Sequence, residues 1–172
     1  MPNQSPFSNA KDNAPVWPLP ILNRNMPSVI DRGLKMPGVH LGYEGDTPTP
    51  RFAPAFACAA GEIVYAGEGD AGYTLVVDHL NGWATYYTGL EHMFAKPRAE
   101  IKTNKLERVK SGDVLGYVDL EHAEHALYFE LWKREGACFS PVNATDHMHT
   151  WALLPWTDEH VARNIATAPI AA

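Results

Sequence analysis

Histidines and acidic residues are the groups in this sequence that could hold a metal ion. The 172 residues include eight histidines, and three segments place them near one another or near acids. These segments are His40-Leu41-Gly42-Tyr43-Glu44 with Asp46 close behind, Glu121-His122-Ala123-Glu124-His125, and His147-Met148-His149. A catalytic zinc needs about three imidazole, thiolate or carboxylate ligands and an open position for water. A zinc site is therefore the first hypothesis to weigh against the positions of these residues.

The segment from His125 to Trp132 is the most strand-like in the chain. Successive residues of a strand point to opposite faces. One face is expected to pack in the core and consists of His125, Leu127, Phe129 and Leu131. The other face has the mixed character of a groove lining and consists of Ala126, Tyr128, Glu130 and Trp132. This alternation predicts that His125 points away from the groove.

The other histidine segments have simpler explanations than a metal site. His122 precedes the strand and is expected in a loop. The segment from His147 to His149 follows the last strand, in a loop-like region with no acid or third histidine arranged for it. A solvated or packing role is expected there.

Short strands at close spacing predict an antiparallel sandwich or barrel. The strands are expected at 55–61, 62–66, 73–78, 83–87, 114–118 and 125–132. A tight turn at Ala60-Gly61 would join the first two, and Asn81-Gly82 is a hairpin signal. Residues 23–37 are expected to be a loop. The predicted organisation is a flexible tail (1–16), one β domain (17–156), and a short helix with a C-terminal tail (157–172).

Composition limits the partners of the protein. The apolar fraction is 45% and the net charge is −6, with both signs interspersed. Nucleic acids and anionic membranes are held by basic patches, so neither is an expected partner. No basic segment followed by an apolar run opens the chain, and no apolar stretch of about 18 residues occurs. The expected location is cytoplasmic, and an extracytoplasmic location would need a non-classical route. Cys58 and Cys138 could form one bridge, but two buried free thiols are expected.

The order of several segments is similar to the lysostaphin/LytM-type zinc endopeptidases, which cut peptide cross-links in peptidoglycan. These segments are Trp17-Pro18-Leu19, the His-x-Gly-x-acid motif at His40, AFACAAGEIVYAG, VVDHLNGWATYY, VKSGDVLGYV and ALYFELW. Together they cover roughly residues 17–142. The resemblance implies a mainly β fold of the LytM-like, duplicated-hybrid-motif type: an antiparallel β-sheet groove or sandwich, with long loops and a short C-terminal helix.

The resemblance also implies which residues should carry the chemistry. In the family, zinc is held by the His and Asp of H-x-G-x-D and by the second His of H-x-H. His40 matches the first ligand, and Glu44 or Asp46 stands for the acid. The H-x-H positions are Ala126 and Tyr128, and Gly89 occupies the position of a further histidine in a Y-x-H-L motif. No catalytic residue is therefore expected, and any metal site would be vestigial.

A lost metal site should leave a structural replacement. Tyr128 could bind zinc only as a phenolate, which its ordinary pKa of about 10 disfavours. We therefore predict that Tyr128 fills the metal position and that its hydroxyl bonds to His40 or Glu44. Tyr128, Glu130 and Tyr87 are the residues expected to line the groove.

Three functions follow as hypotheses. The first is a degenerate domain without a cofactor that holds a peptide, glycan or protein partner in its groove. The second is an active zinc metalloendopeptidase of peptidoglycan cross-links, with a rearranged site built from His40, Glu44 or Asp46, and His122 or His125. The third is an intracellular carrier domain, since the same groove architecture resembles the sugar-phosphotransferase carriers that hold phosphate on a histidine.

Overall fold

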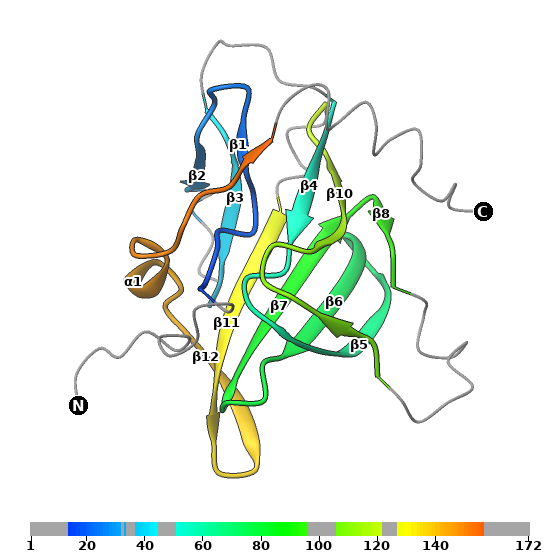
Figure 1. The fold of residues 1–172 in the computed structure, drawn as a ribbon, viewed down its shortest axis with the longest axis vertical. Coiled ribbons are helices and arrows are strands. Elements are labelled where there is room, and N and C mark those ends of the chain that lie inside the picture. Colours follow the sequence, from blue (N-terminus) through cyan, green and yellow to red (C-terminus); the bar gives the residue numbers. More distant parts are fainter. Residues whose placement is uncertain are drawn as a thin grey trace.

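The computed structural model of the chain describes residues 14–31, 33, 37–44, 51–95, 106–121 and 127–156. These residues form a mainly β structure with one short helix, α1 (Thr145–Met148), as Figure 1 shows. The antiparallel, mainly β fold class predicted from the sequence is therefore confirmed. The predicted C-terminal helix and most of the predicted N-terminal tail lie outside the described residues.

The larger sheet contains residues 127–132 of the strand-like segment described above. Its strands run in the order β2 (Pro27–Ile30), β3 (Val39–Tyr43), β11 (Leu127–Glu135), β7 (Trp83–Leu90), β6 (Gly72–Asp78), β5 (Gly61–Gly69) and β9 (Arg108–Val109). A further strand, β12 (Cys138–Val142), pairs with the second half of β11. Every one of these pairings is antiparallel.

A smaller sheet packs against the larger one and closes the core between them. It consists of β4 (Phe52–Phe56), β10 (Val114–Asp119) and β8 (His92–Met93), and it lies across the larger sheet in Figure 1. The core combines Leu75, Val77 and Phe129 from the larger sheet with Leu115 and Val118 from β10. A parallel pair, β1 (Ile21–Leu22) and β13 (Pro155–Trp156), brings the two ends of the described chain together.

The segment between β4 and β5 does not form the hairpin predicted at Ala60-Gly61. β4 belongs to the smaller sheet and β5 to the larger one, so residues 57–60 cross between the sheets. Ala57, Cys58 and Ala59 are fully buried. The backbone of Ala57 accepts a bond from Gly112 N and donates one to Asp113 O, at 2.9 and 2.8 Å. Small side chains let this crossover pass through the core, and residue type alone did not distinguish it from a turn.

Two further expectations need correction. Residues 27–30, predicted as loop, form edge strand β2, where Pro27 occupies the first position and so interrupts little pairing. Both cysteines are free, but only Cys58 is buried. Cys138 is exposed because it begins the return strand of the β11–β12 hairpin.

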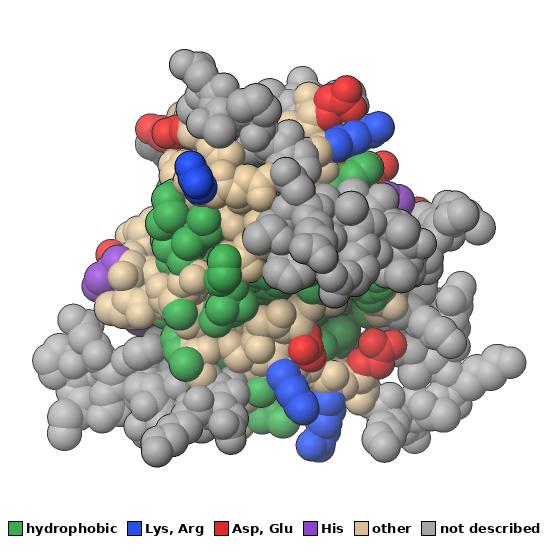
Figure 2. Space-filling model, turned by 45° about the horizontal axis from the view of Figure 1, so that its top comes forward, with side chains coloured by type: hydrophobic (Ala, Val, Ile, Leu, Met, Phe, Trp, Pro, Cys, Tyr) green, Lys and Arg blue, Asp and Glu red, His purple; other side chains and the backbone are tan. Residues whose placement is uncertain are grey.

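The surface agrees with the interspersed charge of the sequence. On the face seen in Figure 2, basic and acidic side chains of the described residues lie near one another. Within the described part of the chain, no helix has the length and apolar character needed to cross a membrane.

Candidate functional site

The two faces of β11 have the alternation that the sequence predicts. Leu127, Phe129 and Leu131 have no exposed surface and belong to the core. Glu130 and Trp132 are half-buried on the opposite face, and Tyr128 on that face is 7% exposed. The predicted orientation of His125 and Ala126 cannot be compared, because both lie outside the described residues.

The register of the larger sheet brings His40 and Tyr128 together. Tyr128 lies directly opposite His40 on β3 and opposite Thr88 on β7. The ring centroids of His40 and Tyr128 are 5.0 Å apart, with a tilt of 48°. The two positions at which the resemblance places zinc ligands are therefore neighbours, and one of them carries a phenol.

The hydroxyl of Tyr128 has other partners than those predicted. It donates to Glu130 Oε1 at 2.9 Å and accepts the backbone N–H of Gly38 at 3.1 Å. The prediction of a bond to His40 or Glu44 was wrong in its partners. The reason is the close approach of Gly38: a Cβ there would lie 2.9 Å from Tyr128 Cζ and would overlap the carbonyl oxygen of Phe129. Only a glycine lets its amide reach the hydroxyl.

Glu130 connects Tyr128 to the next residue on the same face. Its Oε2 accepts Trp132 Nε1–H at 2.9 Å, so each carboxylate oxygen is held by a different ring. Tyr86, opposite Glu130 on β7, stacks on Trp132 at 5.5 Å and 21° and meets Tyr128 edge-on at 6.2 Å. We call Tyr86, Tyr128, Glu130 and Trp132 the polar-aromatic face.

The phenol of Tyr128 is held in its neutral form by this environment. Burial, and then the hydrogen bond with Glu130, raise the pKa of Tyr128 to about 12. A negative carboxylate beside the hydroxyl disfavours a second negative charge. At neutral pH Tyr128 is therefore a hydrogen-bonding group and not an anionic metal ligand.

Gly89 has a backbone conformation that few residues other than glycine adopt. Tyr73 pairs with Leu90 while Thr74 pairs with Thr88, so Gly89 is the extra residue of a β-bulge. Its φ is 93°, in the region where a side chain is strained. The backbone here disfavours a histidine at the position where the resemblance expects one.

Tyr87 does not line the groove, contrary to the sequence prediction. It has no exposed surface, lies opposite Phe129, and accepts the backbone N–H of Cys58 at 3.0 Å. Adjacent residues of a strand face opposite ways, so it is Tyr86 that joins Tyr128. The alternation along 83–87, aligned with that of β11, could have identified Tyr86.

The described residues do not fit a catalytic zinc. No group of three His, Cys, Asp or Glu side chains in the described ranges could hold a metal. The donors at the family positions are the His40 imidazole, the protonated Tyr128 phenol and the exposed carboxylate of Glu44. Asp46, His122 and His125 lie outside the described residues. His147 packs edge-on against Trp83 at 5.4 Å, as a packing role predicts, although from helix α1 and not from a loop.

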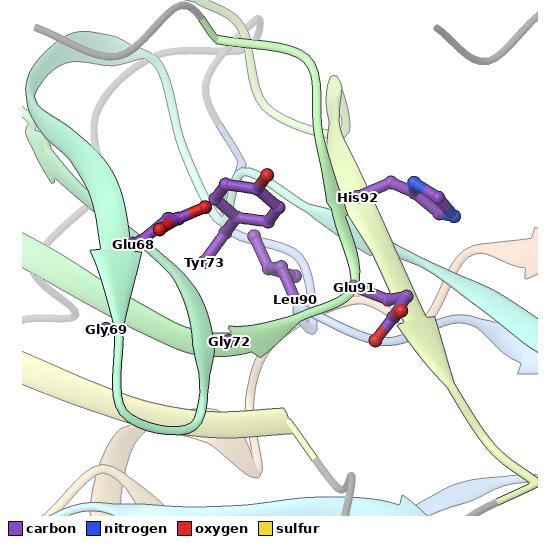
Figure 3. A pocket seen from close by; sticks show the side chains of 7 residues that line it. All are labelled: Glu68, Gly69, Gly72, Tyr73, Leu90, Glu91 and His92. Atoms are coloured by element: carbon purple, nitrogen blue, oxygen red, sulfur yellow. The ribbon is translucent and has the colours of Figure 1, made fainter. Parts of the chain in front are cut away.

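A separate pocket of about 430 Å³ lies beyond Gly89, at the end of β7. Figure 3 shows Glu68 and Tyr73 from the β5–β6 hairpin on one side and Leu90 and Glu91 on the other, with the His92 ring turned outward. Gly69 and Gly72 complete the lining. No motif in the sequence pointed to this pocket.

Comparison with known proteins decides the family. Residues 38–141 match the sequence profile of peptidase family M23. The chain belongs to this family. The matched region of the M23 domain begins at Gly38, which bonds to Tyr128, and ends within β12. No curated protein matches the sequence significantly.

Solved structures support the M23 fold. A candidate glycyl-glycine endopeptidase LytM from Ruminococcus gnavus has a TM-score of 0.60 at 19% identity, covering 84% of this chain and 64% of that one. The antimicrobial peptidase lysostaphin from Staphylococcus simulans has a TM-score of 0.53 at 15% identity, covering 82% and 55%. A structure of the SpoIIQ–SpoIIIAH pore-forming complex has a TM-score of 0.52 at 16% identity, covering 76% and 89%. This chain thus spans less than two-thirds of the LytM and lysostaphin chains. At these sequence identities the likeness concerns the fold alone.

Proposed function

We propose that this M23 domain is catalytically degenerate and acts by binding a partner, not by zinc-dependent hydrolysis. The observation that carries the proposal is the state of Tyr128. Tyr128 stands where the lysostaphin/LytM resemblance places the second zinc-binding histidine, and its hydroxyl is held by Glu130 and by the amide of Gly38. Zinc binding there would require loss of the hydroxyl proton, whose pKa is raised to about 12, and with it the hydrogen bond to Glu130.

The groups that would act beside a metal are also replaced. General acid–base catalysis and oxyanion stabilisation need a side chain that can exchange a proton or donate a hydrogen bond. Gly89 has no side chain, and Ala126 has a methyl group. Even a metal held by His40 and a carboxylate would lack these partners in the family arrangement.

The polar-aromatic face suits a partner that packs on aromatic rings and forms hydrogen bonds. Both oxygens of Glu130 already accept hydrogen bonds from side chains of the face, so the carboxylate is held in place there. Aromatic rings that have a polar edge, as Tyr and Trp do, are enriched in binding surfaces. A peptide, a glycan strand or a segment of a partner protein are the ligands proposed. The SpoIIQ–SpoIIIAH pore-forming complex offers a precedent for this fold in a protein assembly.

The proposal is tested by metal content and turnover measured on the same preparation. The chain is expressed with added zinc, and zinc per chain is measured by mass spectrometry before and after dialysis. Hydrolysis of oligoglycine and of peptidoglycan is followed with and without added zinc. Metal well below one equivalent and no cleavage are the expected results.

A matched variant makes the test specific to the family site. One zinc per chain that is lost in His40→Ala, together with cleavage that is lost in the same variant, would contradict the proposal. Such a result would support the rearranged metallopeptidase site built from His40, Glu44 or Asp46, and His122 or His125.

A further inference from the structure

A second pocket, of about 350 Å³, lies at the start of β5, at the opposite end of that strand from the pocket near Gly89. Three segments that are distant in the sequence line it: residues 60–62, residues 79–80 in the turn after β6, and residues 108–110 with Asp113. Sites for small ligands are concavities of this size, mostly apolar and with a few fixed polar groups. No residue of the polar-aromatic face lines this pocket, so a ligand here is independent of the proposed function.

The charged side chains of the pocket are held in place by contacts within its walls. Arg108 on β9 pairs with Glu62 on β5, with 3.3 Å between Nη2 and Oε1. On the next turn, Oδ2 of Asp113 accepts the backbone N–H of Lys110 at 2.8 Å. These contacts fix both carboxylates before any ligand binds, and each leaves a second carboxylate oxygen to accept a further hydrogen bond.

His79 gives the pocket a rigid and uncharged wall. The residue is 6% exposed, and both ring nitrogens have partners. Nδ1 donates to the carbonyl oxygen of Ala60 at 2.8 Å, and Nε2 lies 2.9 Å from Thr85 Oγ1. Burial is the largest influence on the pKa of His79 and lowers it, so the ring is neutral at neutral pH. The charges that a ligand meets therefore come from the other walls.

Leu80 presents an apolar side chain to the pocket from an unfavourable backbone conformation. Its φ is 62°, which a leucine rarely adopts, and the residue is 63% exposed. The turn is fixed by Asp78, whose Oδ1 accepts the backbone N–H of Leu80 at 2.9 Å. Strained residues of this kind are concentrated at functional sites. Leu80 and the half-buried Val109 together offer the apolar surface that a ligand would cover.

The charges of the lining balance one another. Two cations, Arg108 and Lys110, face two carboxylates, Glu62 and Asp113. Within the described ranges, the only ion pairs are made by Arg51 and Arg108, so the Lys110 ammonium has no acid within 4.0 Å there. A ligand with a single charge would upset this balance. A ligand with one positive and one negative group preserves it, and both of its groups find partners of opposite sign.

We propose that this pocket binds a free amino acid with an apolar side chain, such as leucine, in its zwitterionic form. The carboxylate binds to Lys110 and Arg108, and the ammonium group binds to the second oxygen of Asp113. The side chain packs against Leu80 and Val109. A residue inside a peptide lacks both charges, and a residue at either end of a peptide lacks one of them, so the pocket favours the free amino acid.

Four small molecules separate the three contacts in a titration followed by ¹H–¹⁵N nuclear magnetic resonance of the full chain. We expect leucine to cause saturable shifts in the amides of residues 60–62, 79–80 and 108–113. Leucinamide lacks the carboxylate, N-acetyl-leucine lacks the ammonium group, and glycine lacks the side chain. Each should bind about tenfold more weakly than leucine, or less tightly still. Leucine shifts that are absent or not confined to these segments, or equal affinity for leucine and either derivative, would overturn the proposal.

Variants of the chain test the same contacts from the side of the protein. Lys110→Gln removes an exposed cation, and Leu80→Asn removes the apolar side chain while placing at φ 62° a residue that adopts this conformation more readily. Each should weaken leucine binding about tenfold. Lys133→Gln is the matched control, since Lys133 is exposed on β11 and outside the pocket. Native affinity in both pocket variants, or an equal loss in Lys133→Gln, would refute the site, and the remaining amide shifts verify that each variant is folded.

Discussion

Tyr128 and Glu130, two residues apart on one face of β11, share a hydrogen bond of 2.9 Å. The second oxygen of Glu130 holds Trp132, and the amide of Gly38 holds the Tyr128 hydroxyl from the other side. Where the lysostaphin/LytM resemblance places a zinc ligand, this chain has Tyr128, whose hydroxyl is already hydrogen-bonded to Glu130 and Gly38. The consequences can be measured one residue at a time.

Removing the hydroxyl of Tyr128 should destabilise the domain. In Tyr128→Phe the Gly38 amide loses its acceptor and Glu130 loses one of its two donors. Both groups are half-buried, so the loss should cost about 1 kcal/mol, and urea unfolding measures it. Tyr65→Phe is the control, because Tyr65 is 44% exposed and should change stability by less than about 0.5 kcal/mol. Equal effects in the two variants would show that the hydrogen bonds of Tyr128 contribute little.

Neutralising Glu130 should make the Tyr128 phenol more acidic. Burial and Glu130 together raise the pKa of Tyr128 to about 12, so the fold keeps a proton that the unfolded chain loses near pH 10. Stability therefore decreases as the pH rises from about 10 toward 12. Glu130→Gln should lower the pKa and narrow this window, as ultraviolet titration of tyrosinate would detect. An unchanged titration would mean that burial alone determines the pKa.

The bulge at Gly89 should tolerate no side chain without cost. Its φ of 93° lies where L-residues are strained, so Gly89→Ala should cost about 1 kcal/mol or more. Gly67→Ala on β5 is the matched control, since Gly67 has no positive φ and its nearest neighbour is the end of the exposed Tyr65 side chain. Both variants are compared by thermal unfolding. If Gly89→Ala is as stable as Gly67→Ala, the positive φ of Gly89 does not disfavour a side chain at this position.

The alternation along β11 and the hairpin at Asn81-Gly82 could be predicted from sequence because both depend on neighbouring residues. The pairing of His40 with Tyr128 could be predicted from the family motifs, which encode the register of β3 and β11. The hydrogen-bond partners of Tyr128 could not be predicted from sequence. The Gly38 amide reaches the Tyr128 hydroxyl only because of that register and because glycine has no Cβ.

The crossover at residues 57–60 shows a second limit of sequence reasoning. AFACAAG has the small and apolar residues of either a strand ending in a turn or a buried connection. Which one forms depends on whether β4 pairs with β5 or with β10, a non-local choice. The prediction that Tyr87 lines the groove is wrong for a related reason. The motif contains both Tyr86 and Tyr87, and only the orientation of β7 in the sheet determines which of the two rings is buried.

The central claim is that Tyr128 excludes zinc from the family position. The most direct measurement is zinc affinity, by calorimetry at neutral pH, of the native chain and of Tyr128→His. The variant restores an imidazole beside His40, whose ring now lies 5.0 Å from that of Tyr128. We predict no zinc binding in the native chain and detectable binding in Tyr128→His that is abolished by adding His40→Ala. Equally tight binding of one zinc by both proteins would contradict the account.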